Sequence, residues 1–438
     1  MFWIGYTTRY RNGSAKFARA ADTLRAELER RHPGAEVVLE PLERKRDFIA
    51  AMNRLDDAGS LIDELHFLGH SGMYGIMFGA TAWPEQLSPH EWRSLRIPFA
   101  PDASAHFHAC RTARWFAPFF ARTFGVRSFG HHGYTTVSIR PHRFTPEGYR
   151  FGRSGPLYLV SVPGRKTHGW SGTLRKYALR PRVDPMLGFE PTPAPDASYD
   201  AVAELYDRAF SDIRVRRDEW RWLSERLEQA FPRVGQAPRV LDLGCGNGAL
   251  LLGLRERIAS GAGVDASRAM IERAKRRAAA HPQLTFTTID GPTLPFADAS
   301  FDVVTSFLSF RYLDWDPILG EVRRVLAPGG RLLIVDMVEQ ALALRDTPLL
   351  LRSLSRHLLR HVRDRRFVRD VRALTAQPAW RVMLAHNPIR AVHEYRWYLE
   401  SRFPGQKLST LNVSRRARLV AFDTGELWPE AILPLTYP

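Results

Sequence analysis

The chain contains 438 residues, of which 45% are hydrophobic and 25% charged, so it can bury two or three domain cores and is not a disordered polymer. Its first residues contain no basic segment followed by a long apolar stretch, and no run reaches the roughly 18 consecutive apolar residues that a membrane span needs. We therefore expect a soluble, cytoplasmic protein that has no membrane partner.

Strands and helices alternate over residues 1–150, which we predict to be the first domain. Short apolar runs predict the strands, and the amphipathic segments between them predict the helices. The pattern begins strand, helix, strand, helix, strand, which favours a parallel sheet with right-handed crossovers. The predicted strands are Phe2–Thr7, Ala35–Leu39, Leu61–Leu68, Ala105–Ala109 and Val126–Gly130, and the predicted helices are Ser14–Arg31, Arg44–Asp57 and Thr112–Thr123.

The pattern decays over residues 151–198 into sequence rich in glycine, proline and arginine, and we predict a linker there. Residues 199–438 form the predicted second domain, which opens with helical sequence over Tyr199–Phe231. A long arginine-rich helical insertion, 341–402, separates its fifth predicted strand from its sixth. The predicted strands after the first are Gly261–Val264, Leu284–Thr288, Phe301–Ser306, Arg331–Val335, Lys407–Val413 and Ala417–Asp423.

The net charge of +17 raises the question of a nucleic-acid partner. Most of the basic residues are arginine, however, beside abundant alanine and proline, and a GC-rich bacterial genome produces this usage through its codons. We interpret the charge as a solvated surface, which makes a nucleic-acid partner the less favoured alternative. The two cysteines, Cys110 and Cys245, fall in different predicted domains, which argues against a disulfide framework and fits a reducing compartment.

A glycine-rich turn, Asp242–Gly248 (DLGCGNG), follows the first strand of the second domain. Glycines let the backbone turn sharply and leave no side chain between the chain and a ligand, so a nucleoside can lie against the main chain. About twenty residues later the next strand ends in Asp265, whose carboxylate can accept hydrogen bonds from both hydroxyls of a ribose. Together the two features predict a nucleoside-binding site.

The segment 199–338 resembles the class I S-adenosylmethionine-dependent methyltransferases. Its turn reads D-x-G-x-G-x-G, which is similar to the methyltransferase version and lacks the spacing of NAD-binding proteins, and the runs 294–304 and 321–330 are similar to the rest of the family's core. The resemblance implies a Rossmann-like fold with S-adenosylmethionine as cofactor. It also implies a set of cofactor-binding residues, namely Asp242, Gly244, Cys245, Gly246, Asp265, Ala266, Met270, Asp290, Gly291 and Phe307.

The same resemblance gives these residues separate tasks. Met270 would pack on the adenine, and Asp290 would hold its amino group. Asp242 would order the glycine loop and the methionine end of the cofactor, whereas Cys245 would fill a small slot behind it. Phe307 belongs to the segment after the fourth strand, which lies beside the reacting methyl group in this fold.

The sulfonium of the cofactor carries the activation itself, so the protein has chiefly to align an acceptor and exclude water. Tyr312 is predicted either to orient that acceptor or to pack, and the segments around Tyr199 and Tyr206 resemble the lid of small-molecule methyltransferases. We hypothesise that the insertion 341–402 is a substrate cap that confers specificity. Its candidate pocket residues are His361, His386, His393, Tyr395 and Trp397.

A histidine and a cysteine follow two strands of the first domain, His70 in the run GHSG and Cys110 in the run ACR. Parallel strands that end side by side would bring the imidazole to the thiol, as a nucleophilic thiolate requires. The segment 2–138 resembles the caspase-like (clan CD, CHAT-type) cysteine peptidases, which implies a catalytic dyad of His70 and Cys110. However, His108 and Thr112 stand where the caspase signature has glutamine and glycine. The alternative is a binding or scaffolding α/β domain with a buried Cys110.

The leading hypothesis is a two-domain α/β enzyme, with a caspase-like parallel-sheet domain followed by a Rossmann-like methyltransferase that carries a helical cap. The methyltransferase would act on a small-molecule acceptor, and the first domain would serve recognition or regulation. The alternatives are a bifunctional cysteine peptidase-methyltransferase that acts on a peptide or protein, and a nucleic-acid methyltransferase. We predict no metal site.

Overall fold

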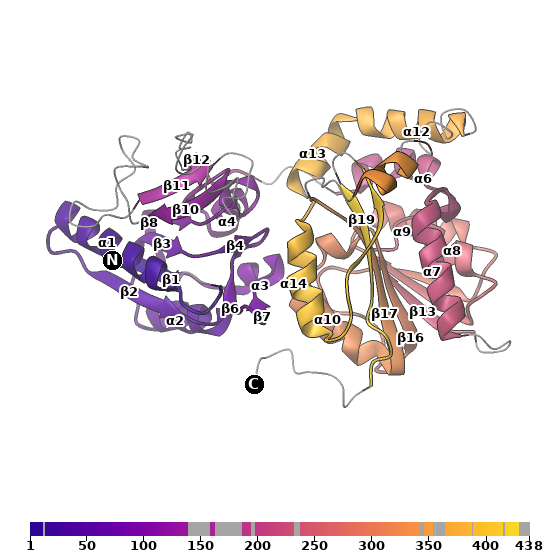
Figure 1. Ribbon diagram of the computed structural model, residues 1–438, viewed down its shortest axis with the longest axis horizontal. Coiled ribbons are helices and arrows are strands. Elements are labelled where there is room, and N and C mark those ends of the chain that lie inside the picture. Colours follow the sequence, from indigo (N-terminus) through magenta and orange to yellow (C-terminus); the bar gives the residue numbers. More distant parts are fainter. Residues whose placement is uncertain are drawn as a thin grey trace. The chain divides into compact units, whose positions relative to one another are not determined.

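The computed structural model describes residues 1–11, 14–138, 158–162, 186–193, 198–231, 237–340, 346–353, 355, 364–387, 389–414 and 417–428. The chain divides into two compact units, Met1–Ala194 and Pro195–Pro438. Each unit is a layered α/β structure built on a largely parallel sheet (Figure 1), which confirms the predicted fold class at that level. Among the described residues no helix combines the length and the apolar character that crossing a bilayer requires.

The sheet of the first unit has the strand order β12-β9-β8-β3-β1-β2. Its first five strands along the chain pair in parallel, and the short β12 pairs antiparallel with β9. β12 lies within 151–198, so part of the segment predicted to be a linker extends this sheet. The strands are β1 (Phe2–Thr7), β2 (Val37–Leu42), β3 (Ile62–Leu68), β8 (Phe99–His108), β9 (Arg127–Gly130) and β12 (Leu187–Phe189).

Helices cover both faces of this sheet. On one face, α1 (Ser14–Arg31) packs its apolar stripe on Phe2, Ile4 and Leu68. On the other face lies an aromatic core contributed by the strands and by α2 (Lys45–Asp57), α3 (Pro89–Ser94) and α4 (Phe116–Phe124). Side chains alternate along a strand, so β3 sends Leu65 and Phe67 into that aromatic core and Glu64, His66 and Leu68 to the face that α1 covers.

The connections of the first unit differ from the prediction in two places. The helix predicted over Thr112–Thr123 is a 3-10 turn, η1 (Thr112–Arg114), followed by α4, because the backbone of Trp115 leaves the helical region with φ −145° and ψ −46°. Short antiparallel pairs occupy segments where no strand was predicted. They are β4 (Ser71–Gly72) with β5 (Gly75–Ile76), β6 (Phe78–Ala80) with β7 (Trp83–Glu85), and β10 (Tyr134–Ser138) with β11 (Tyr158–Val162).

The second unit contains a seven-stranded sheet of order β15-β14-β13-β16-β17-β19-β18. The strands from β13 to β17 pair in parallel, whereas β19 runs antiparallel to both of its neighbours. The order reverses at β13, and ligands of open parallel sheets bind at the carboxyl ends of strands at such a point. The strands are β13 (Arg239–Leu243), β14 (Ser260–Asp265), β15 (Leu284–Thr288), β16 (Phe301–Phe307), β17 (Leu326–Val338), β18 (Ser409–Val413) and β19 (Arg418–Asp423).

Two helical layers enclose the second sheet (Figure 1). One layer is α10 (Trp315–Val325) with α14 (Val392–Arg402), and the other is α7 (Arg217–Ala230), α8 (Ala249–Leu254) and α9 (Arg268–Arg277). The sequence over Tyr199–Phe231 was predicted to be helical, and it forms several helical pieces. The chain breaks after Phe210, where the side chain of Asp212 caps the next turn by accepting from the N–H of Arg214. The resulting pieces before α7 are η3 (Asp200–Val202), α6 (Ala203–Ala209) and η4 (Ile213–Val215).

The insertion 341–402 is largely helical where it is described, with α12 (Arg365–Ala376), α13 (Pro378–His386) and α14. Leu374 of α12 joins Val202 and Ala209 in a small buried cluster, and the ring of Trp380 in α13 packs on Tyr199 and Tyr206. The insertion therefore packs on the segments that the sequence suggested as a lid.

Candidate cofactor site

The glycine turn follows β13 at the point where the sheet order reverses. Gly244, Gly246 and Gly248 have φ angles of +71°, +53° and +74°, which side chains other than glycine rarely tolerate. A Cβ on Gly244 would lie 2.4 Å from Cβ of Ser309, so packing also demands glycine there. A Cβ on Gly246 would meet no atom within 4 Å, so the main chain at Gly246 borders open space.

Asp265 closes β14 and faces this turn. The N–H of Gly246 donates to Oδ2 of Asp265 and the N–H of Ser267 donates to Oδ1, both at 2.8 Å. Each carboxylate oxygen has a second lone pair, so both oxygens can still accept from a ligand. The arrangement fits a ribose diol, with the carboxylate fixed by backbone donors before any ligand arrives.

A cavity of about 290 Å³ opens over the turn and the carboxylate. Six of the predicted cofactor residues line it: Gly244, Gly246, Asp265, Ala266, Met270 and Phe307. The other lining residues are Ser198, Tyr199, Tyr206, Ser267, Leu308, Ser309, Tyr312, Leu313 and Asn387.

The remaining predicted cofactor residues lie outside the cavity lining. Asp242 is buried beneath the turn, where the hydroxyl of Thr305 donates to its Oδ1 at 2.9 Å and burial raises its pKa to about 7. Cys245 is also buried, and burial raises the pKa of its thiol, so it is a neutral packing group behind the turn. Asp290 and Gly291 are exposed just beyond β15, and neither contributes to the lining.

Comparison with known proteins identifies the same segment. Residues 240–330 match the family described as a methyltransferase domain. A demethylmenaquinone methyltransferase of Thermus thermophilus is 38% identical over 142 residues, which cover 29% of this chain and 63% of that protein. The 27-O-demethylrifamycin SV methyltransferase of Amycolatopsis mediterranei is 33% identical over 156 residues, which cover 32% of this chain and 57% of that protein. The chain thus spans less than two thirds of the length of these relatives.

The carboxy-terminal unit therefore contains a region similar to the class I methyltransferases, and we refer to it as the methyltransferase unit. Its cofactor is S-adenosylmethionine. A solved S-adenosylmethionine-bound amino pentose methyltransferase from Micromonospora echinaspora is 30% identical to this chain, with 27% of this chain and 49% of that chain covered and a TM-score of 0.24. The open space at Gly246 and the spare acceptors of Asp265 fit S-adenosylmethionine, because it presents a nucleoside with two hydroxyls.

Three tyrosines of the methyltransferase unit line the cavity, Tyr199, Tyr206 and Tyr312. The hydroxyls of Tyr199 and Tyr312 lie 3.2 Å apart, and Nη2 of Arg311 donates to the hydroxyl of Tyr312 at 2.9 Å. Burial raises the pKa of Tyr199, so its phenol stays protonated. None of these was among the predicted cofactor residues, although the spacing of seven between Tyr199 and Tyr206 would put both on one helical face.

A buried ion pair with Asp336 holds the guanidinium of Arg311 in place. The backbone N–H of Arg311 donates to Oδ2 of Asp336 at 2.7 Å, and the hydroxyl of Tyr395 donates to the same oxygen at 2.6 Å. Tyr395 therefore supports β17 and does not line the cavity. Within the described part of the insertion, Asn387 lines the cavity. The predicted pocket residue His361 lies outside the described residues.

Leu308 lines the cavity and has an unusual backbone conformation. Its φ is +63°, a conformation that costs a residue with a side chain roughly 1 kcal/mol, and its N–H donates to the carbonyl oxygen of Val335 at 2.7 Å. Such strain gathers at functional sites because the surrounding structure has to impose it. The left-handed turn brings the segment after β16 over the glycine turn, where Ser309 donates to the carbonyl oxygen of Leu243 at 2.5 Å.

The two residues of the predicted dyad follow the carboxyl ends of two adjacent central strands of the first unit. β3 and β8 are parallel neighbours, so His70 and Cys110 both come after the carboxyl ends of these strands. The hydroxyl of Ser71 donates to the carbonyl oxygen of Cys110. The ring of His70 packs edge to face against Tyr10 and Phe17. The sulfur of Cys110 lies 3.2 Å from the donating N–H of Thr135 and 3.4 Å from its hydroxyl.

Proposed function

We propose that the methyltransferase unit transfers the methyl group of S-adenosylmethionine to a small-molecule acceptor. The cofactor supplies an electrophilic methyl group when bound. Asp265 would hold the ribose hydroxyls, Gly244 and Gly246 would let the cofactor lie on the main chain, and Met270 would pack on the adenine. The observation that carries the proposal is the single cavity in which the glycine turn, Asp265 and the tyrosines meet.

The lining of the cavity favours an acceptor that contains an aromatic or quinoid ring. Phe307, Leu308 and Leu313 offer apolar surface, and the paired phenols of Tyr199 and Tyr312 offer hydrogen bonds to a polar substituent. Aromatic walls with a few convergent polar groups are typical of small-molecule sites. Two relatives are named as methyltransferases of a demethylmenaquinone and of a demethylrifamycin, and these names support the same class of acceptor.

The described lining of the cavity offers the acceptor no strong base. Among the described residues that line the cavity there is no histidine, and the one carboxylate, Asp265, is bound to two backbone donors. Tyr199 does not act as a base because burial raises its pKa and keeps the phenol protonated. We therefore propose a phenol or hydroquinone, whose oxygen or ring carbon becomes nucleophilic on loss of the hydroxyl proton to water. The tyrosines position this acceptor, and they do not remove its proton.

A methyl-transfer assay with the full chain tests this function. The protein is incubated with S-adenosylmethionine labelled in the methyl group and, separately, with a naphthohydroquinone, a simple phenol, a cyclohexanol of similar size and a short peptide. We expect labelled product from the hydroquinone or the phenol, with a rate that rises as the pH approaches the acceptor pKa, and none from the cyclohexanol. Labelling of the peptide alone would contradict a small-molecule acceptor, and labelling of the cyclohexanol would contradict the argument about the base.

A second function is proposed for the first unit, as a caspase-like domain in which Cys110 is a nucleophile and His70 its base. The parallel neighbours β3 and β8 support it, because both residues follow the carboxyl ends of these adjacent strands. A thiol-reactive peptide probe should label Cys110, and His70→Ala should abolish the labelling. Labelling that survives His70→Ala would refute the dyad and leave a binding or scaffolding domain.

A further inference from the structure

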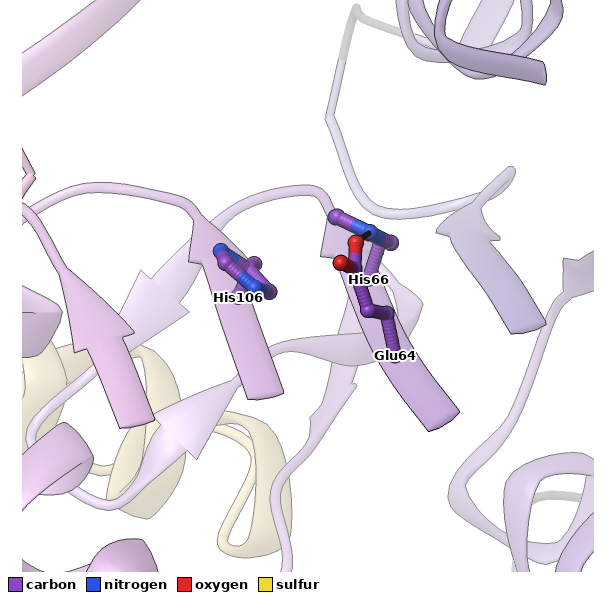
Figure 2. A group of neighbouring side chains, drawn as sticks. All are labelled: Glu64, His66 and His106. Carbon is purple, nitrogen blue, oxygen red and sulfur yellow. Dashed lines mark hydrogen bonds and ion pairs between the residues drawn. The ribbon is translucent and has the colours of Figure 1, made fainter. Parts of the chain in front are cut away.

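A compact group of ligating side chains lies on the first unit's sheet, apart from His70 and Cys110. β3 and β8 pair in a register that sets His66 directly opposite His106. Glu64 precedes His66 by two residues, so all three side chains emerge on the same face of the sheet. Figure 2 shows the carboxylate of Glu64 beside the two imidazole rings.

The distances among these groups suit a shared ion. One ligand atom from each of Glu64, His66 and His106 lies within 4.8 Å of the others. Nε2 of His66 is 2.9 Å from Oε2 of Glu64, and the rings of His66 and His106 stack with centroids 4.6 Å apart. A small shift of side chains would thus place two nitrogens and one oxygen around a single metal ion.

Neighbouring side chains hold the two imidazoles in orientation. Nδ1 of His66 lies 3.2 Å from Nε2 of His108, and Nε2 of His106 lies 2.9 Å from the hydroxyl of Ser104. The ring of His106 also stacks on Phe129, with centroids 4.5 Å apart and planes 5° from parallel. Metal-binding histidines are oriented in this way, because the nitrogen that does not bind the metal is held by a hydrogen bond.

The carboxylate side of the group is accessible to a cation, and the nearby positive charges are those of Arg31 and Arg127. His66 is buried, with its side chain 5% exposed, whereas the side chain of Glu64 is 27% exposed, so the group opens to solvent on the carboxylate side. Glu64 offers a carboxylate oxygen as a ligand atom, and the two imidazoles offer one nitrogen each.

We propose that Glu64, His66 and His106 form a binding site for one divalent transition-metal ion. Two imidazoles and a carboxylate are the ligands that Zn²⁺ and Fe²⁺ prefer, and three protein ligands leave a coordination position for water or a small ligand. Mg²⁺ prefers an all-oxygen octahedron and does not suit this donor set. The site is independent of the function proposed for the methyltransferase unit. The competing account is a hydrogen-bonded chain from Glu64 through His66 to His108 that only supports the fold.

The test uses the full chain, free of any affinity tag and treated with a chelator. Calorimetric titration with ZnCl₂, and anaerobically with Fe²⁺, should show one tightly bound ion per chain, whereas MgCl₂ should show none. Glu64→Gln keeps a carbonyl oxygen as an acceptor for His66 and removes the charge, so the hydrogen-bonded chain survives while the affinity for Zn²⁺ falls by at least about tenfold. His106→Gln should cause a similar loss, and His90→Gln, at an exposed position of α3, should cause none.

A second pair of measurements keeps the test decisive if a variant folds poorly. Co²⁺ bound by the wild-type protein should give the visible absorption of a low-symmetry nitrogen and oxygen site, and far-ultraviolet circular dichroism shows which variants are folded. A wild-type protein that binds neither Zn²⁺ nor Fe²⁺ stoichiometrically would overturn the proposal. So would folded Glu64→Gln and His106→Gln proteins that both bind Zn²⁺ as tightly as the wild type, because the ion would then be held elsewhere.

Discussion

Replacing Asp265 by asparagine probes the cofactor site with the smallest change of shape. Both carboxylate oxygens accept a backbone N–H at 2.8 Å and keep a lone pair for a ribose hydroxyl. The amide retains one of these oxygens, so Asp265→Asn loses one charge-assisted hydrogen bond to the diol, worth roughly 1.5–3 kcal/mol. The amide nitrogen also meets either the N–H of Gly246 or that of Ser267, which leaves one backbone donor unpaired and adds to the loss.

The expected result is a dissociation constant for S-adenosylhomocysteine that rises by at least about tenfold, since about 1.4 kcal/mol corresponds to one factor of ten. Isothermal titration calorimetry on the full chain measures it. Asp298→Asn is the matched control, because that side chain is 79% exposed and belongs to the same unit without lining the cavity. Equal dissociation constants for the wild type and Asp265→Asn would refute the assignment of Asp265 to the ribose.

Three further predictions concern the turn and its supports. Gly244→Ala should prevent stable folding of the methyltransferase unit, as measured by thermal unfolding, because its Cβ would overlap Ser309. Gly246→Ala should fold, with an unfolding free energy lowered by only about 1 kcal/mol, and yet fail to bind S-adenosylhomocysteine. The pKa of Asp242 is raised to about 7, so its contribution to stability is complete below about pH 4 and is lost as the pH rises from there through 7. Asp242→Asn should therefore match the wild-type melting temperature below about pH 4 and exceed it above about pH 8. Equal melting temperatures in both ranges would contradict this. Tyr395→Phe removes one of the two donors to the buried Oδ2 of Asp336, which keeps the N–H of Arg311. It should lower the unfolding free energy by about 1–3 kcal/mol in chemical denaturation while the affinity for the cofactor stays unchanged.

Local sequence was enough to predict that the glycine turn and Asp265 would lie together. The turn around Gly244 and Gly246 depends on glycines that are adjacent in the chain, and Asp265 ends the next strand, so both follow from one strand-turn-helix unit and its neighbour. Asp290 illustrates the limit of such reasoning, because its position after β15 is right for the family pattern but its side chain is exposed outside the cavity lining.

Features that depend on distant pairings were not predictable from local sequence. Tyr199 and Tyr312 are 113 residues apart, and their contact requires the lid segment to fold over the end of β16. The alternation of histidines in the predicted strand Ala105–Ala109 was visible, but the group with Glu64 and His66 exists only because β3 and β8 pair in one register. A shift of one residue would send His106 to the opposite face of the sheet.

A crystal structure of the full chain with S-adenosylhomocysteine would test the central claim most directly. We expect electron density for one molecule in the cavity over the glycine turn, with both ribose hydroxyls on the carboxylate of Asp265 and the sulfur directed toward Tyr199 and Tyr312. A ligand bound elsewhere, or a ribose that does not contact Asp265, would contradict the account of this site.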